Sequence, residues 1–227
     1  MSISKRGLLL APRLLAAALI VSSACAYAQE GTEYRKLERA QSTLSPGKIE
    51  VVEFFSYGCP HCGHFLPLLD AWAAKLPKDV VLRRVPVGFH RPAWINLQRT
   101  YYALQAEGDL GKLDAALFHA IHEEQRQLLE EPSIAEWIGK NGGDAAKFSA
   151  AYVSFGVNNQ TVQADKMAED YGIGGIPAMA VNGEYEAMAD STHGELPYLA
   201  NLLANVDKLI AKVRAERAPA KAAPKRQ

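Results

Sequence analysis

Residues 54–64 read Phe-Phe-Ser-Tyr-Gly-Cys-Pro-His-Cys-Gly-His, and their two cysteines, Cys59 and Cys62, stand where one pattern gives way to another. Before them, residues 49–55 form a short, nearly continuous apolar run typical of a strand buried on both faces. After them, Pro60 suits the first turn of a helix, and apolar residues recur at helical spacing through residue 76. We therefore predict that the cysteine pair lies where a buried strand turns into a helix.

Further elements follow along the chain. Residues 80–87 predict a second strand, parallel to the first if the helix crosses over between them. Residues 92–156 then show helical patterns alone, in four consecutive stripes. The elements expected beyond them are a helix over 157–171, a breaker run at 172–177, a strand at 178–181 that turns at Asn182-Gly183, and an amphipathic helix over 199–213.

These patterns predict an α/β fold with an insertion. Residues 29–91 and 157–217 would form one domain, and residues 92–156 a helical subdomain inserted into it. Residues 218–227 contain mainly Ala, Pro and Lys with little to bury, which predicts a disordered tail.

The first 28 residues have the features of an export signal. Lys5 and Arg6 give a basic start, residues 14–21 are uninterruptedly apolar, and Ala26-Tyr27-Ala28 has the small-x-small form of a cleavage site. The alternatives are a membrane anchor, for which the apolar stretch is too short, and a lipoprotein modified at Cys25, for which the preceding residues are unsuitable. We expect cleavage near Ala28 and a mature protein in the periplasm.

Charge and compartment narrow the possible functions. Removal of residues 1–28 leaves 22 basic and 25 acidic residues, a net charge of −3, which is no electrostatic footprint for nucleic acid. About 200 residues can bury a core without a disulfide or a metal. An exported protein also meets an oxidising environment, in which paired cysteines are normally bonded.

Three roles are open to the cysteine pair. A structural clip would close so short a loop that it removes only about 2 kcal/mol of unfolded-state entropy. A metal site is the second possibility, because the segment contains side chains that bind metals. Four ligands within so short a segment cannot easily surround one ion tetrahedrally, however, and no second Cys-x-x-Cys follows. The ligand types concerned are Cys59, His61, Cys62 and His64, with His119 and His122 as distant candidates that we expect to face solvent.

The third role, a redox couple, explains why the cysteine pair stands at the start of a helix as well as why a histidine lies between the two cysteines. At a helix N-terminus, backbone N–H groups and the helix dipole favour the thiolate form of Cys59, and a nearby His61 adds positive charge when protonated. A stabilised reduced form makes the disulfide oxidising. Cys62, one turn further in, would be the resolving thiol.

The chain resembles the DsbA family of bacterial periplasmic thiol-disulfide oxidoreductases, which have the thioredoxin fold. The resemblance covers nearly the whole mature chain, and the helical block corresponds to the family's inserted all-helical subdomain. The matching residues are Glu53-Phe54-Phe55-Ser56, Cys59-Pro60-His61-Cys62, and Gly175-Ile176-Pro177-Ala178-Met179 followed by Val181-Asn182-Gly183.

The resemblance also implies roles for individual residues. Pro177 would be a cis-proline opposite the dithiol, and Ile176, where the family usually has valine or threonine, would contact substrate. Glu53 would be a buried carboxyl with a raised pKa that relays a proton to Cys62. Arg84, on the neighbouring strand, stands where the family tends to have a basic partner, and whether the two side chains pair is left open. The alternative is a solvated Glu53 at a sheet edge. His64 lies outside the motif and is expected to be a surface histidine.

The activity expected is donation of the Cys59–Cys62 disulfide to newly translocated cysteine-containing polypeptides, through a mixed disulfide on Cys59. We expect a monomer that needs no metal or organic cofactor, because the dithiol itself carries both electrons. The resemblance implies reoxidation by a quinone-linked membrane protein of the DsbB type. The alternatives are a reductase of the same fold, a disulfide isomerase, for which no dimerisation segment is evident, and a periplasmic metallochaperone that binds a thiophilic metal through the two cysteines.

Overall fold

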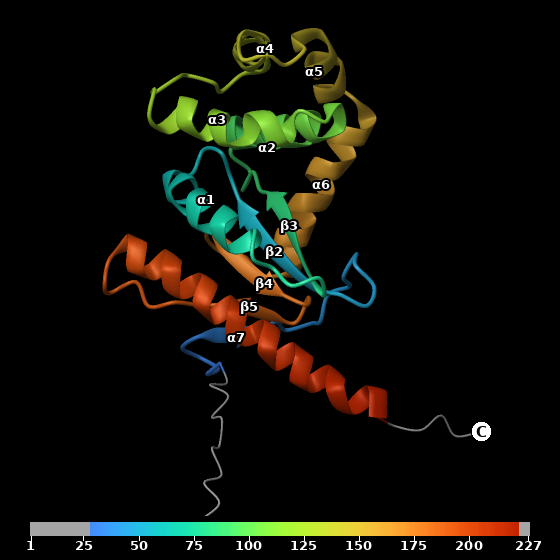
Figure 1. Cartoon of the computed structure of the whole chain (residues 1–227). Coiled ribbons are helices and arrows are strands. Elements are labelled where there is room, and N and C mark those ends of the chain that lie inside the picture. The colour runs from blue at the N-terminus through green and yellow to red at the C-terminus, as the bar shows by residue number, and fades with distance from the viewer. Residues whose placement is uncertain (1–27, 223–227) are drawn as a thin grey trace, which may run out of the picture.

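The computed structural model describes residues 28–222 (Figure 1). The predicted signal peptide, residues 1–28, falls outside the described residues except for Ala28. Within the described part, no helix combines the length and the apolar character needed to cross a membrane. The elements in chain order are β1 (Tyr34–Lys36), β2 (Ile49–Phe55), α1 (Pro60–Ala73), β3 (Val80–Pro86), α2 (Pro92–Glu107), α3 (Leu110–His122), α4 (Glu131–Lys140), α5 (Ala145–Tyr152), α6 (Phe155–Asp170), β4 (Ala178–Val181), β5 (Tyr185–Ala187) and α7 (Glu195–Ala222).

A five-stranded sheet in the order β1-β5-β4-β2-β3 forms the centre of the molecule. Strand β2 runs parallel to β3 and antiparallel to β4, and all seven of its residues are buried. The parallel pairing was predicted from the crossover helix and is confirmed. Strand β1 was not predicted; its three residues pair with β5 at the sheet edge.

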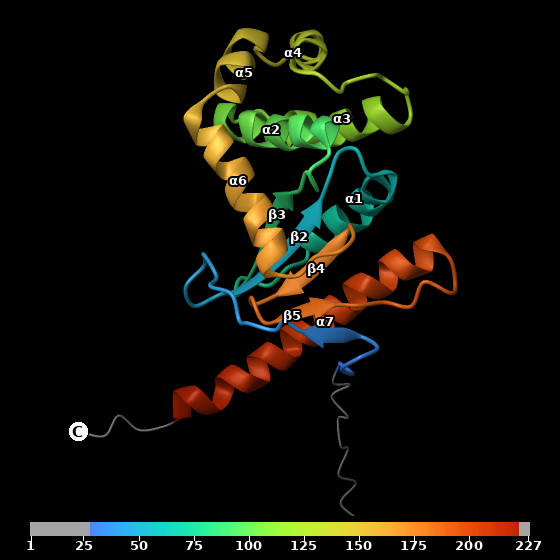
Figure 2. The same cartoon turned by 180° about the vertical axis from the view of Figure 1, so that it is seen from behind.

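Helices cover both faces of the sheet. Helices α1 and α7 pack on one face, where Phe65 and Leu69 meet Leu199 and Leu202 over Val51. Helix α6 lies on the opposite face, which is turned to the viewer in Figure 2. Because side chains alternate along a strand, Glu53 shares the face of Val51 and lies on the side that α1 covers.

Helices α2 to α5 form a layer at the carboxyl ends of β2 and β3 (Figure 1). Their four predicted helical stripes are confirmed. Their apolar side chains continue the core on the α6 side of the sheet, so the layer and the sheet share one buried cluster. The expected boundary after residue 156 falls in the first turn of α6, which runs from this layer down to the sheet.

The last helix differs from the sequence-based expectation. Helix α7 continues to Ala222, whereas we expected disorder from residue 218 onward. The alanines and Lys221 of this stretch are good helix formers and extend a helix that the core has already anchored, although Pro219 lacks the backbone donor of a regular helical turn. Residues 223–227 of the expected tail lie outside the described residues.

Candidate active site

Cys59 and Cys62 occupy the start of α1, as the sequence predicts. Cys59 is the N-cap residue, with φ −98° and ψ 115°, and Pro60 begins the first turn. Both thiols are unbonded, so this is the reduced form. Cys59 is 5% exposed and Cys62 is 1% exposed, so Cys59 is the more accessible sulfur.

The surroundings of Cys59 favour its thiolate. The pKa of Cys59 is lowered to about 6, chiefly by a hydrogen bond from the Cys62 thiol. The backbone N–H groups of Cys62 and His61 and the charge of His61 lower it further, whereas burial opposes the change. Burial instead raises the pKa of Cys62, and the neighbouring Cys59 adds to the rise. The two cysteines thus have opposite characters, one ionised and one protonated at neutral pH.

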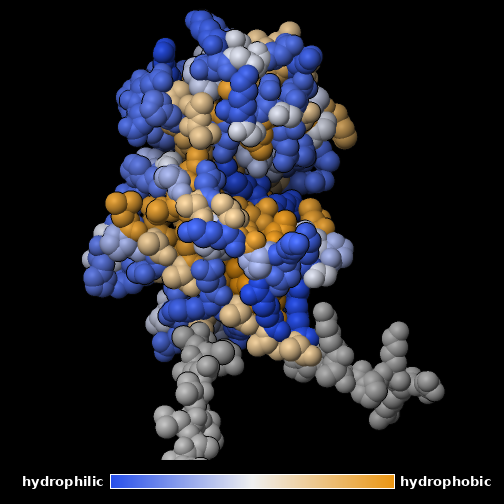
Figure 3. All heavy atoms as spheres, viewed as in Figure 1, coloured by the Kyte–Doolittle hydropathy of each residue, from blue (hydrophilic) through white to orange (hydrophobic). Residues whose placement is uncertain are grey.

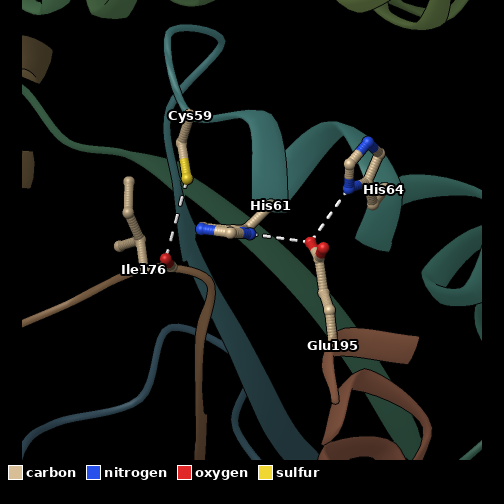
Figure 4. Close-up of polar contacts among 5 residues, drawn as sticks. All are labelled: Cys59, His61, His64, Ile176 and Glu195. Atoms are coloured by element: carbon tan, nitrogen blue, oxygen red, sulfur yellow. Dashed lines mark hydrogen bonds and ion pairs between the residues drawn. The ribbon is translucent and has the colours of Figure 1, made fainter. Parts of the chain in front are cut away.

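His61 and His64 both lie against one carboxylate. Nδ1 of His61 is 2.7 Å and Nδ1 of His64 is 2.9 Å from Oε1 of Glu195, the first residue of α7 (Figure 4). The hydrogen bond to Glu195 raises the pKa of His61, so the imidazole stays cationic beside Cys59 over a wider pH range. His64 is exposed, as expected, but this contact was not foreseen.

The loop before β4 lies opposite the dithiol. The Ile176–Pro177 peptide bond is cis, which confirms that part of the expectation. The carbonyl oxygen of Ile176 lies 3.7 Å from Sγ of Cys59 and faces it (Figure 4). A groove of about 290 Å³ begins here, lined by His61, Ile176, Pro177, Ser191, Gly194, Glu195, Tyr198 and Leu199. In the space-filling view, apolar side chains gather in a band across the middle of the molecule, between the helical layer and α7 (Figure 3).

Beneath α1, Glu53 is fully buried and paired. The strand register sets it beside Arg84, whose Nε donates to its Oε2 at 2.5 Å, so the alternative of a solvated edge carboxylate is wrong. Burial raises the pKa of Glu53, and the guanidinium opposes that rise. Burial alone would lower the pKa of Arg84, but the charges of Glu53 and Asp114 outweigh it and raise that pKa.

The inserted subdomain also reaches the site. Asp114 of α3 accepts from Nη1 of Arg84 at 2.5 Å and from the hydroxyl of Tyr57 at 2.5 Å. Nε2 of His122 donates to the carbonyl oxygen of Tyr57 at 2.8 Å, so His122 is a structural contact and not the solvent-facing residue that we expected. These residues hold the loop that precedes Cys59, and no local pattern marked them.

The match to known proteins agrees with this geometry. A family profile described as "DSBA-like thioredoxin domain" matches residues 50–196. The chain belongs to the DsbA family. The thiol:disulfide interchange protein DsbA of Bordetella parapertussis is 40% identical over 177 residues, which cover 76% of this chain and 84% of that protein. The DsbA of Pseudomonas syringae pv. tomato is 36% identical over 220 residues, which cover 96% and 99%.

Solved structures give the same result. The crystal structure of Pseudomonas aeruginosa DsbA superposes with a TM-score of 0.76 at 36% identity and covers 83% of this chain and 95% of that one. The chain is therefore a thiol-disulfide oxidoreductase with the thioredoxin fold, and, as for other DsbA proteins, its partners are substrate proteins.

Proposed function

We propose that this DsbA family member is an oxidase that donates the Cys59–Cys62 disulfide to exported polypeptides. A substrate thiolate attacks Sγ of Cys59, forms a mixed disulfide and expels Cys62, which takes up a proton. The second substrate thiolate then attacks the substrate sulfur and expels Cys59 as a thiolate. Two electrons pass from the substrate to the enzyme. The observation that carries the proposal is the environment of Cys59, because a stabilised thiolate is a good leaving group.

Glu53 is the group that we assign to the proton of Cys62. Cys62 leaves its disulfide as a buried thiolate, for which ionisation is unfavourable, so it needs a nearby acid. Burial raises the pKa of Glu53, and its Oε1 is buried without a hydrogen-bond partner among the described residues. The carboxyl can therefore hold a proton at that oxygen while Oε2 stays bonded to Arg84.

Ile176 and Pro177 are assigned to substrate binding. They border the groove beside Cys59, and the groove is mainly apolar, which suits an extended and partly unfolded polypeptide. The expected periplasmic location rests on residues 1–28, outside the described part. We also propose that the protein is a monomer. Because each turnover consumes the disulfide, a membrane protein of the DsbB type would reoxidise the dithiol.

The direction of electron flow is tested by equilibrating the protein with glutathione redox buffers and measuring the oxidised fraction. A potential near about −120 mV, the value characteristic of DsbA proteins, supports an oxidase. A potential near about −270 mV, as in thioredoxin, would make the protein a reductase.

The attacked sulfur is tested with two variants. Cys62→Ser should accumulate a mixed disulfide with a reduced, unfolded substrate, whereas Cys59→Ser should form none through Cys62. Equal trapping by the two variants would contradict attack at Cys59. Metal retained through the two thiols under reducing conditions would instead favour a metallochaperone.

A further inference from the structure

Two imidazoles and a carboxylate converge next to the dithiol. His61 and His64 are three residues apart on α1 and so share one face of the helix. Their Nδ1 atoms lie 2.7 Å and 2.9 Å from the same oxygen, Oε1 of Glu195. In Figure 4 the His61 ring stands between the Cys59 sulfur and this carboxylate, with Nδ1 turned toward Glu195. The convergence is thus on the side of His61 away from Cys59.

The arrangement differs from the other histidine ion pairs of the described residues. Each of the other described histidine ion pairs joins one imidazole to one carboxylate, as His119 does with Glu124 at 3.3 Å. Two imidazolium rings on one carboxylate oxygen would repel each other. Among residues 28–222, His61, His64 and Glu195 are the one group of three side chains whose ligand atoms lie within 4.8 Å of one another.

The three side chains offer the kinds of donor atom that zinc prefers. Imidazole nitrogen and carboxylate oxygen are ligands of zinc, and two histidines with one glutamate leave a coordination position for water. With metal–ligand distances of about 2.0–2.1 Å, ligand atoms in a tetrahedron lie about 3.3 Å apart. Oε1 must therefore withdraw by about 0.5 Å from the two Nδ1 atoms, and the three atoms, now within 4.8 Å of one another, must settle at a common separation. The side chains of His61, His64 and Glu195 are 60%, 49% and 35% exposed, which gives both access and freedom for that adjustment.

We propose that His61, His64 and Glu195 form a binding site for a divalent transition-metal ion of the zinc type, separate from the two thiols. The ion would bind through both Nδ1 atoms and the carboxylate, with water in the remaining positions. It would join the first two turns of α1 to the first residue of α7, beside the groove that His61 and Glu195 line. This inference concerns metal binding and does not rest on the proposed direction of disulfide transfer.

The test uses the mature, oxidised protein without a polyhistidine tag, because the Cys59–Cys62 disulfide removes the thiolates as competing ligands. Calorimetric titration with Zn²⁺ in a non-coordinating buffer should show saturable binding of one ion per chain. His64→Gln and Glu195→Gln should each weaken it at least about tenfold, since each removes a ligand. The matched control His119→Gln, at an exposed histidine with a single carboxylate partner, should bind as the wild type does. Absence of saturable binding, or unchanged affinity in His64→Gln, would overturn the proposal.

A second measurement needs no variant. In the oxidised wild type, the ¹⁵N resonances of Nδ1 of His61 and His64 should shift together on addition of one equivalent of Zn²⁺, while those of His119 stay in place. Co²⁺ should bind with ligand-field bands but without thiolate charge-transfer absorption. Perturbation of His119 instead of His61 and His64 would refute the site.

Discussion

Replacement of Arg84 by methionine tests the buried charge cluster beneath the active site. Arg84 bonds to two carboxylates, Glu53 and Asp114, and the side chains of Arg84, Glu53 and Asp114 are 13%, 0% and 15% exposed. Methionine retains most of the packing volume but leaves both carboxylates without a cation. Removing one member of a buried ion pair costs about 3–5 kcal/mol, and with two carboxylates affected we expect the upper part of that range.

The pH dependence of that cost follows from Glu53. Its pKa in the folded protein is raised by burial, and Arg84→Met removes the cation that opposes the rise. The folded variant therefore binds more protons than the unfolded chain above about pH 4.3, and its free energy of unfolding falls as pH rises. The penalty should be smaller at pH 5 than at pH 8, because protonation of Glu53 relieves the part of the cost that its unpaired charge causes.

The assay is equilibrium unfolding of the oxidised protein in urea at pH 5 and at pH 8. Arg83→Met is the matched control, because Arg83 neighbours Arg84 on the same strand and its side chain points to the other face. It should change stability by no more than about 0.5 kcal/mol. A cost of Arg84→Met below about 1 kcal/mol at pH 8, or a cost that does not grow between the two pH values, would refute the reasoning.

Three further predictions concern the dithiol and its loop. In the reduced protein, the rate of Cys59 alkylation should rise with pH with a midpoint of about 6, and a midpoint above 8 would contradict the described environment. Because folding lowers this pKa, the free energy of unfolding of the reduced form should increase as pH rises from about 6 to about 9. Gly58→Ala should lower the free energy of unfolding by about 1–3 kcal/mol, because its Cβ would lie 2.5 Å from Nε1 of Trp94. Gly156→Ala, whose Cβ would meet only Oγ of Ser154 at 3.9 Å, should not, and equal thermal shifts would contradict this. Glu53→Gln should slow oxidation of a reduced peptide at least about tenfold in stopped-flow fluorescence, because an amide cannot exchange the proton; an unchanged rate would exclude the relay.

Local pattern predicted most of the fold. Strand β2 and helix α1 could be recognised because apolar runs and helical spacing are properties of neighbouring residues. Strand β1 could not, because three residues carry no period, and their conformation depends on pairing with β5. The end of α7 could not be predicted, because an Ala-Pro-Ala-Lys-Ala segment indicates disorder by its composition, whereas here it continues a helix that tertiary contacts have nucleated.

The site was predicted only as far as its motif extends. The cysteines, His61 and the proline loop are contiguous signals, whereas the pairing of Glu53 with Arg84, which the sequence leaves open, is set by the strand register. Glu195 carried no signal, because an acidic residue in the first turn of a helix is common for reasons of capping and dipole. Asp114 likewise looked like an ordinary polar residue of α3, and only the packing of that helix over Tyr57 reveals its role.

The convergence on the cysteine loop has a consequence for biosynthesis. The surroundings of Cys59 combine Tyr57, Asp114 and His122 with Ile176 and Glu195, so they come from segments spread over most of the chain. A polypeptide made from its N-terminus exposes both cysteines long before the last helix exists. Until that helix docks, His61 lacks Glu195, the partner that raises its pKa, and the groove beside Cys59 lacks the wall that Glu195, Tyr198 and Leu199 supply, so the site is complete only when the chain is.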